Sequence, residues 1–292
     1  MAEQAIKAGF IGAANIAGEH ARALFALGGF EFAGHVDSDE HAARQFARLT
    51  GSKAMSSAEK VIAAADTVWV CTPPKLHRRF AESVLAAGKN LYCEKPLAAD
   101  LADAQAIAAA ADEARGLAAI GFNFRLHAAW QKLKELVEAG ELGEPVAFFF
   151  SRIGRGAQGG WRRDPAQMCG MTVESVSHNV DMIRFILGEV GEAAALQAAS
   201  DKTQPKFDDC LAANFKMASG AIGSLQATWA SALGATRHVV AGREASAIIE
   251  GPSQFEFTQL RVRGRDEASE RVFNFPPPLN SVYDADLSLI HI

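Results

Sequence analysis

The chain has 292 residues, of which 49% are hydrophobic and 22% charged, proportions typical of a globular protein of one large domain or two ordinary ones and not of a disordered chain. The formal net charge of −5 predicts no general basic surface for nucleic acid. No apolar run is long enough for a membrane span, the first residues do not resemble a signal peptide, and four scattered cysteines favour a reducing cytoplasm over a disulfide framework.

The first half of the chain alternates short apolar strands with helical segments. In chain order, strands are expected at residues 5–11, 30–36, 67–71, 90–93 and 117–122, and helices at 16–27, 40–49, 58–64, within 73–85 after a loop, and at 101–114. Strands that alternate with helices form a parallel sheet joined by right-handed crossovers. We therefore predict an α/β domain over residues 1–122, with the boundary next to Asn123.

The second half, residues 123–292, changes character. The expected elements are a helix at 128–139, a strand at 145–153, a long functional loop at 154–171, a helix at 173–187, and short strands at 210–217, 221–229, 237–241 and 245–250. Gly220, Gly234 and Gly242 separate the last strands, a spacing that favours an antiparallel meander.

The turn after the first strand is the first candidate ligand site. The pattern GxGxxG occurs there with alanine at its second and third glycine positions. A helix that begins at such a turn offers free N–H groups to a pyrophosphate. The residues expected to contact a dinucleotide cofactor are Gly12, Ala13, Ala14, Asn15 and Ile16. Taken alone, the fragment is equally compatible with an ordinary strand-to-helix turn.

Asp37 ends the second expected strand, 25 residues after Gly12. A carboxylate there accepts hydrogen bonds from the adenosine ribose hydroxyls of NAD, and it repels the additional phosphate of NADP. We therefore expect NAD as the cofactor and NADP less. Without the preceding turn, Asp37 would be interpreted as a solvated acid at the end of a strand.

Two more loops follow expected strands and so lie at the carboxyl edge of the sheet, where ligands bind in such folds. One contains Thr72, Pro73 and His77, and the other contains Glu94 and Lys95 before a proline. A lysine at that edge can donate to a substrate hydroxyl and stabilise the alkoxide that forms as hydride leaves. The structural alternatives are a rigid proline turn for the first loop and a surface ion pair for the second.

In the second half, Glu174 and His178 are four residues apart on an expected helix and share a face, and Asp181 follows three residues later. A histidine is a natural proton acceptor for an alcohol being oxidised, and Glu174 can orient it or contact the substrate. A metal site is the rival interpretation, weakened because no second His or Cys cluster lies nearby, and a structural helix-face pair is the third. In the loop before the helix, Trp161 and Arg162 can bind a polyhydroxylated or anionic ligand.

Together these residues resemble the Gfo/Idh/MocA family of NAD(P)-dependent oxidoreductases, over about residues 6–229. The resemblance is carried by Glu94-Lys95-Pro96, Thr72-Pro73-Pro74-x-x-His77, Gly121-Phe122-Asn123-x-Arg125, and Trp161-Arg162-Arg163-Asp164-Pro165 followed by Glu174-x-x-x-His178-x-x-Asp181. It implies a Rossmann domain followed by a domain with a large open, mostly antiparallel sheet on which homo-oligomers are built. The implied substrates are sugars, inositols and related polyols or their keto forms.

By this resemblance, Lys95 binds and polarises the reacting hydroxyl, His178 is the general acid/base, and Glu174 occupies a position that is usually Asp. Asn123 is implied to contact the cofactor and Arg125 the substrate. The expected reaction is hydride transfer between NAD and a secondary alcohol or ketone, without a metal. Two alternatives are an NAD-dependent glycoside hydrolase of the same fold that uses transient oxidation, and a non-catalytic NAD-binding regulator.

Two features lie outside this pattern. The other histidines have no motif around them and are interpreted as structural or surface residues. At the end of the chain, the resemblance implies a final helix packed against the sheet, which residues 286–292 do not resemble. We interpret this end as truncated or read-through and expect the last ~10 residues to be poorly packed; burial of Leu289 and Ile290 would contradict this.

Overall fold

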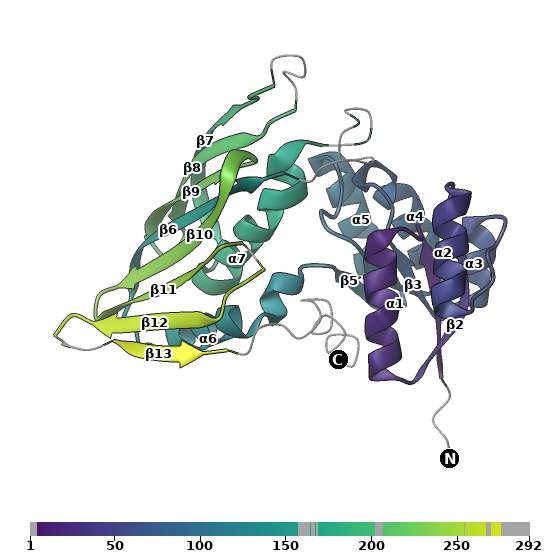
Figure 1. The fold of residues 1–292 in the computed structure, drawn as a ribbon, viewed down its shortest axis with the longest axis horizontal. Helices are drawn as coiled ribbons and strands as arrows, with labels where there is room; N and C mark the ends of the chain where they lie inside the picture. Colours follow the sequence, from purple (N-terminus) through teal and green to yellow (C-terminus); the bar gives the residue numbers. More distant parts are fainter. Residues whose placement is uncertain are drawn as a thin grey trace. The chain divides into compact units, whose positions relative to one another are not determined.

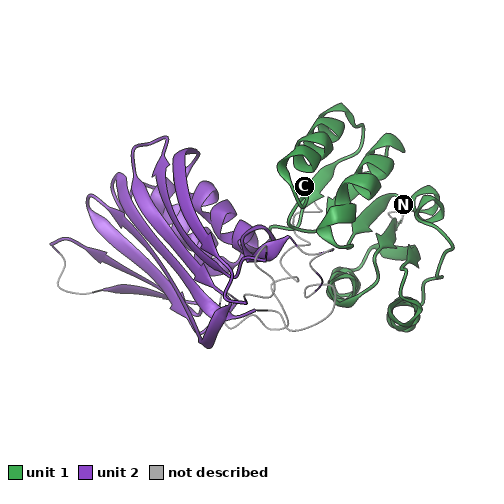
Figure 2. Ribbon diagram, turned by 90° about the horizontal axis from the view of Figure 1, so that it is seen from above, with its two compact units in different colours: residues 1–122, 283–292 green, residues 123–282 purple. Residues whose placement is uncertain are grey.

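The computed structural model describes residues 5–156, 164, 167, 169–201, 207–253, 255–266 and 270–275. They form two compact units that separate between Phe122 and Asn123 (Figure 2). The expectations for the C-terminal end and the candidate ligand contacts of Trp161 and Arg162 lie outside the described residues.

Within the described residues, the first unit contains a five-stranded parallel sheet in the order β2-β1-β3-β4-β5 (Figure 1). Its elements are β1 (Ile6–Ile11), α1 (Asn15–Leu27), β2 (Phe30–Val36), α2 (Glu40–Thr50), α3 (Ala58–Ala64), β3 (Thr67–Val70), the 3-10 turn η1 (Pro74–Leu76), α4 (His77–Ala86), β4 (Asn90–Cys93), α5 (Leu101–Glu113) and β5 (Ala118–Ile120). The predicted parallel α/β sheet is confirmed.

Local sequence explains these elements. Helices α1 and α2 cover one face of the sheet, and α3, α4 and α5 cover the other, so all four residues of the central strand β3 are buried. Asp39 caps α2 by accepting the N–H of His41 at 2.8 Å. Gly51 ends the same helix in the left-handed conformation, with φ 69°.

The strand order positions the candidate ligand residues. β2 lies on one side of β1 and β3 on the other, so the order reverses between β1 and β3. In open α/β sheets, ligands bind outside the carboxyl ends of the strands at this point of reversal. The turn at Gly12 follows β1 and the loop at Thr72 follows β3, which places both at the expected location within this unit.

The second unit contains an eight-stranded sheet among its described residues, in the order β13-β12-β11-β10-β6-β9-β8-β7. Its elements are the 3-10 turn η2 (Asn123–Leu126), α6 (Ala128–Glu138), β6 (Pro145–Arg155), the π-helical turn η4 (Thr172–Val176), α7 (Ser177–Leu187), β7 (Val190–Ala198), β8 (Cys210–Met217), β9 (Ile222–Thr228), β10 (Ala230–Gly242), β11 (Ala245–Gly251), β12 (Gln259–Gly264) and β13 (Arg271–Asn274). The expected large, mostly antiparallel sheet is confirmed.

The connectivity of this sheet differs from a simple meander. Strand β6 lies between β9 and β10, and its pairing with β9 is parallel, so two antiparallel meanders flank it. Gly234 does not end a strand, because β10 continues through it with a register shift between Ala230 and Ala235. Strands β7, β12 and β13 were not predicted; in β7 the residues after Val190 are all exposed, so no alternation of buried and exposed positions marks it.

One face of this sheet is covered and the other is exposed. Helices α6 and α7 pack on the covered face (Figure 2). Trp130, Leu133, Phe148 and Phe150 are buried there. Phe149, between the last two, points to the opposite face and is 55% exposed. The alternation along β6 therefore separates a core face from an open face.

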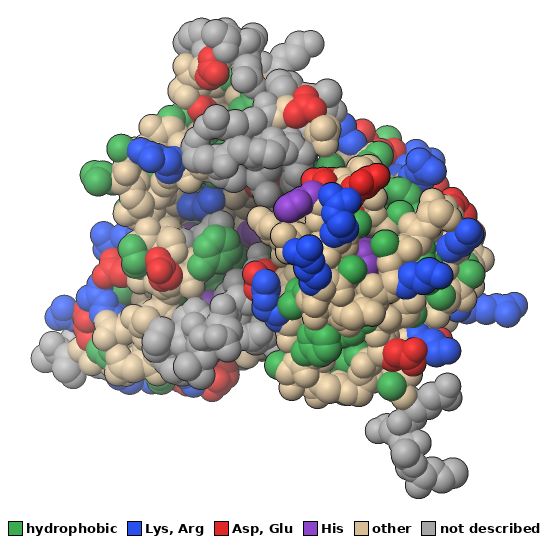
Figure 3. Space-filling view, turned by 45° about the vertical axis from the view of Figure 1, so that its right-hand side comes forward, with side chains coloured by type: hydrophobic (Ala, Val, Ile, Leu, Met, Phe, Trp, Pro, Cys, Tyr) green, Lys and Arg blue, Asp and Glu red, His purple; other side chains and the backbone are tan. Residues whose placement is uncertain are grey.

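Basic and acidic side chains are interspersed on the face of the molecule that Figure 3 shows. In the part of the chain that the structure describes, no helix combines the length and apolar composition needed to cross a membrane.

Candidate active site

The turn between β1 and α1 is built around Gly12, whose φ is 88°. A Cβ at this position would lie 2.6 Å from the main-chain oxygen of Cys71, so the close approach of the two loops requires glycine. Ala14, by contrast, has φ −81° and an exposed side chain, which explains why alanine is accepted there. In the described chain no side chain caps the first turn of α1, and its N–H groups therefore suit an anionic ligand such as a pyrophosphate.

Asp37 fixes this turn. Its Oδ2 accepts the N–H of Ala13 at 2.7 Å, and its Oδ1 accepts the N–H of Asp39 at 2.8 Å. A carboxylate has lone pairs for further acceptor contacts, so the ribose role predicted for Asp37 is compatible with its role in the turn.

His77, for which we predicted contact with the cofactor, lies between the loops after β3 and β4. Its side chain is fully buried, with Nε2 2.8 Å from the carbonyl oxygen of Thr72 and Nδ1 2.9 Å from that of Pro96. Burial lowers the pKa of His77 despite the hydrogen bond to Thr72. The imidazole thus links the loop after β3 to the loop after β4, and its predicted cofactor contact stays a prediction. The buried Oγ1 of Thr72 has no hydrogen-bond partner among the described residues, so it is able to bind a cofactor there.

Glu94 and Lys95 are not a surface ion pair. Glu94 is 7% exposed, and its Oε1 lies 2.7 Å from Nε2 of His20 on α1. Its Oε2 accepts the main-chain N–H of Lys95 at 3.0 Å. Lys95 itself is half-buried, and the Lys95–Pro96 peptide is cis. No motif surrounds His20, so its hydrogen bond to Glu94 could not be predicted from the sequence.

In the second unit, Glu174 lies in the π-helical turn and His178 in the first turn of α7. Both are buried, with exposures of 5% and 4%. The ring of His178 stacks on Phe124, with centroids 4.2 Å apart and planes 16° from parallel. The helix predicted at 173–187 is present, but its first residues form a π-helical turn instead of an α-helical one; such turns frequently accompany functional sites.

Arg125 and Asp181 pair with each other. Arg125 donates from Nε at 2.9 Å and from Nη2 at 2.6 Å to the two carboxylate oxygens of Asp181. This hydrogen bonding raises the pKa of Arg125. The pair joins η2 to α7 within the second unit, and the substrate contact that the resemblance implied for Arg125 stays a prediction. Asn123, at the start of η2, is buried, and its Oδ1 has no hydrogen-bond partner among the described residues.

Arg152 is a candidate that sequence reasoning missed. It lies on β6 opposite Thr236 of β10, and its Nη1 is buried without a hydrogen-bond partner in the described chain. Burial lowers the pKa of Arg152 to about 10, although the negative charge of Glu174 acts to raise it. Burial and Arg152 together lower the pKa of His238 to about 3. The alternation of the strand could have indicated this residue, because Arg152 lies on the same face as the buried Phe148 and Phe150.

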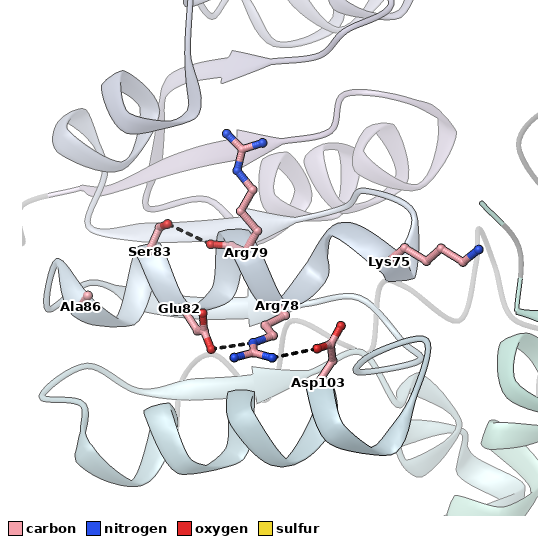
Figure 4. Close-up of a pocket in the computed structure, with 7 residues that line it drawn as sticks. All are labelled: Lys75, Arg78, Arg79, Glu82, Ser83, Ala86 and Asp103. Carbon is pink, nitrogen blue, oxygen red and sulfur yellow. Dashed lines mark hydrogen bonds and ion pairs between the residues drawn. The ribbon is translucent and has the colours of Figure 1, made fainter. Parts of the chain in front are cut away.

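The surface groove in Figure 4 contains none of the predicted site residues. It has a volume of about 620 Å³ and lies over α4 and α5, with its lining residues Lys75, Arg78, Arg79, Glu82, Ser83, Ala86 and Asp103. Arg78 lies between Glu82 and Asp103 and donates to both, whereas Arg79 points away from them. The two carboxylates therefore compensate the charge of Arg78. Within the described ranges, no group of three or more His, Cys, Asp or Glu side chains is arranged to hold a metal ion.

Comparison with known families gives two matches. Residues 6–122 match a family described as "Oxidoreductase family, NAD-binding Rossmann fold", named GFO_IDH_MocA. Residues 130–248 match the GFO/IDH/MocA C-terminal domain. The first match identifies residues 6–122 as an NAD-binding Rossmann fold, and the second lies in the second half of the chain.

Individual relatives agree with these matches. The chain is 28% identical to a 1,5-anhydro-D-fructose reductase of Ensifer adhaerens, over 82% of this chain and 74% of that protein. It is 30% identical to a glucose-6-phosphate 3-dehydrogenase of Bacillus subtilis, over 62% and 53%, and 31% identical to an inositol 2-dehydrogenase of Cereibacter sphaeroides, over 63% and 54%. It thus spans about half the length of the last two. A levoglucosan dehydrogenase solved with NADH and levoglucosan has the same fold, with a TM-score of 0.88, 21% identity, and coverage of 99% of this chain and 88% of that one.

Proposed function

The chain belongs to the Gfo/Idh/MocA family of oxidoreductases, and from this premise we propose that it transfers a hydride between NAD and a secondary alcohol or ketone of a sugar, inositol or related polyol. The names of its relatives, which are reductases and dehydrogenases of sugars and inositol, support this substrate class. The observation that carries the proposal is the placement of Lys95 after β4, at the same sheet edge as the Gly12 turn.

The proposed roles follow from the residues. The turn from Gly12 to Ile16 holds the pyrophosphate, and Asp37 holds the ribose; Thr72, Glu94 and Asn123 complete the cofactor side. NAD, when bound, accepts or returns the hydride. Lys95 donates to the oxygen of the reacting alcohol, and His178 removes its proton, with Glu174 at its side. Trp161 and Arg162 are proposed to bind the rest of the substrate.

We further propose that residues 1–122 form the cofactor-binding domain. Residues 123–292 form a domain that binds substrate and a second copy of the chain. The proposed location is the cytoplasm. None of the four cysteines, all of which are described, forms a disulfide, which supports a reducing compartment.

The function is tested by incubating the protein with NAD or NADP and a panel of inositols, sugars and anhydrosugars, while NADH absorbance and released sugars are followed. We expect NADH to form from NAD with at least one polyol, and to form faster than NADPH forms from NADP, because Asp37 repels the additional phosphate. Release of free sugar without net NADH would favour the glycoside hydrolase. Tight NADH binding with no turnover of any substrate would favour the regulator.

The open face of the second unit's sheet supports the proposed homo-oligomer. Phe149 is 55% exposed, Ile222 60% and Leu196 79%, and apolar side chains gathered on one sheet face are typical of association surfaces. We expect Phe149→Glu and Ile222→Glu to convert the oligomer to a monomer in light scattering. Leu101→Glu, at a residue of the first unit that is 72% exposed, is the matched control and should leave the mass unchanged. A wild-type monomer would refute the proposal.

A further inference from the structure

His20 and Glu94 form a buried pair between α1 and the loop after β4. His20 is fully buried and Glu94 is 7% exposed, and Nε2 of the imidazole lies 2.7 Å from Oε1 of the carboxylate. An ionised carboxylate can only accept hydrogen bonds, so the N–H of His20 donates. A hydrogen bond that is both charge-assisted and buried is among the stronger polar contacts in a protein.

The second carboxylate oxygen connects this pair to Lys95. Oε2 of Glu94 accepts the main-chain N–H of Lys95 at 3.0 Å. The carboxylate is therefore bound on one side by the imidazole and on the other by the peptide that carries the lysine. If the imidazole is removed, Glu94 keeps its contact with Lys95 but loses the group that fixes its orientation.

Packing leaves the carboxylate little other space. The ring of Tyr92 contacts His20 edge-on, with centroids 4.9 Å apart. A Cβ at Gly121 would lie 3.0 Å from Oη of Tyr92 and 3.2 Å from Oε1 of Glu94. The absence of a side chain at Gly121 thus accommodates both polar groups, and the geometry of the pair depends on three elements: α1, β4 and the end of β5.

The charges around Glu94 favour its ionised form. Burial raises its pKa, but the hydrogen bond and charge of His20, the charge of Lys95 and the Lys95 N–H outweigh burial, so the pKa of Glu94 is lowered. The other titratable groups that sense Glu94 electrostatically are His77 of α4, Cys71 after β3 and Cys93 of β4. Burial makes the pKa of His77 lower and those of both thiols higher, so at neutral pH His20 and Lys95 are the groups expected to stabilise the carboxylate.

We propose that His20 is a positioning residue for Lys95: its N–H holds the Glu94 carboxylate ionised and oriented, and that carboxylate holds the peptide from which the lysine reaches the reacting oxygen. The inference rests on the proposed function for the role of Lys95. It assigns no contact of His20 with substrate or cofactor.

The first test is kinetic. His20→Ala should lower kcat by about 10–100-fold, because a reacting group displaced by about 1 Å loses that much rate, and should change the KM for NAD little. Without His20, burial should raise the pKa of Glu94, so the acid limb of the kcat–pH profile should move to higher pH. His20→Gln, whose amide can donate to Glu94, should restore part of the rate. The matched control is His41→Ala, at an exposed histidine of α2, which should match wild type.

Glu94→Gln covers the possibility that His20→Ala destabilises the fold. The glutamine has the same size and does not ionise, so this variant should lose rate like His20→Ala but show no acid limb from residue 94. An unshifted acid limb and unchanged kcat in His20→Ala would overturn the inference.

A second readout does not need turnover. Lysines are dimethylated with ¹³C-formaldehyde, and the Lys95 signal is identified by its loss in Lys95→Arg. On acidification, this signal should change at a higher pH in His20→Ala than in wild type, as Glu94 takes up a proton. Coincident titrations in the two proteins would overturn the inference whether or not any sugar is oxidised. If the titrations differ but no substrate is turned over, the proposed function fails and the His20–Glu94–Lys95 linkage stands.

Discussion

Replacing either Lys95 or His178 by alanine is expected to collapse turnover while NADH binding persists. Removal of one donor that stabilises a developing oxyanion lowers kcat by about 10²–10³-fold, and loss of a general base lowers it by about 10²–10⁴-fold. Neither side chain is proposed to hold the pyrophosphate or the ribose, so NADH fluorescence titrations should give dissociation constants close to wild type.

The Lys95→Ala and His178→Ala variants need controls in which another lysine and another histidine are replaced by alanine. Lys60→Ala removes an exposed lysine of α3 that contacts Ser56, and His41→Ala removes an exposed histidine of α2. Both should retain full activity. Because Lys95 and His178 are proposed to act in one step, the double variant should lose much less than the product of the two single losses. Unchanged turnover in both single variants would refute the assignment.

Gly12→Ala is expected to remove NAD binding and destabilise the first unit. The residue adopts φ 88°, and the added Cβ would lie 2.6 Å from the main-chain oxygen of Cys71. Backbone atoms of a central strand end cannot move away as a flexible side chain can, so the turn should distort and its N–H groups should lose their alignment on the pyrophosphate. We expect a loss of about 1–3 kcal/mol in the free energy of unfolding and a large loss of NADH affinity.

Gly88→Ala separates the effect of the left-handed backbone from the effect of the Cβ collision. Gly88 has φ 68°, and a Cβ there would meet nothing within 4 Å, so the variant carries the strain of the left-handed backbone without a collision. It should lose roughly 1 kcal/mol of stability and bind NADH like wild type. Denaturant unfolding and NADH titration of both variants check the prediction, and equal behaviour of Gly12→Ala and Gly88→Ala would contradict it.

The first unit could be predicted from the sequence because its elements are local. Each strand is short and apolar, each is followed by a helix, and the right-handed crossover leaves few alternatives for the sheet. For the second sheet, the sequence predicted a large, mostly antiparallel sheet but not the order of its strands. The parallel pairing of β6 with β9 joins residues that are far apart in sequence, and β7 has an alanine-rich, exposed sequence that no alternation distinguishes from a loop.

The candidate site, too, was predicted only in part. Motifs located Gly12, Lys95 and His178, but hydrogen-bond partners across elements were not visible in them. The sequence did not indicate that Asp181 binds Arg125 or that His77 links two loops. His20 was missed for the same reason, since its partner is 74 residues away in the chain. These partnerships depend on the tertiary fold and carry no local signature.

We propose that Lys95 and His178 act on the same oxygen of one substrate. A crystal structure of the protein with NADH and a polyol from the active panel would test this proposal. We expect the ammonium of Lys95 and a ring nitrogen of His178 both to lie within hydrogen-bonding distance of the oxygen on the carbon that faces the nicotinamide. A ligand bound at the nicotinamide with either group out of reach of its reacting oxygen would refute the proposal.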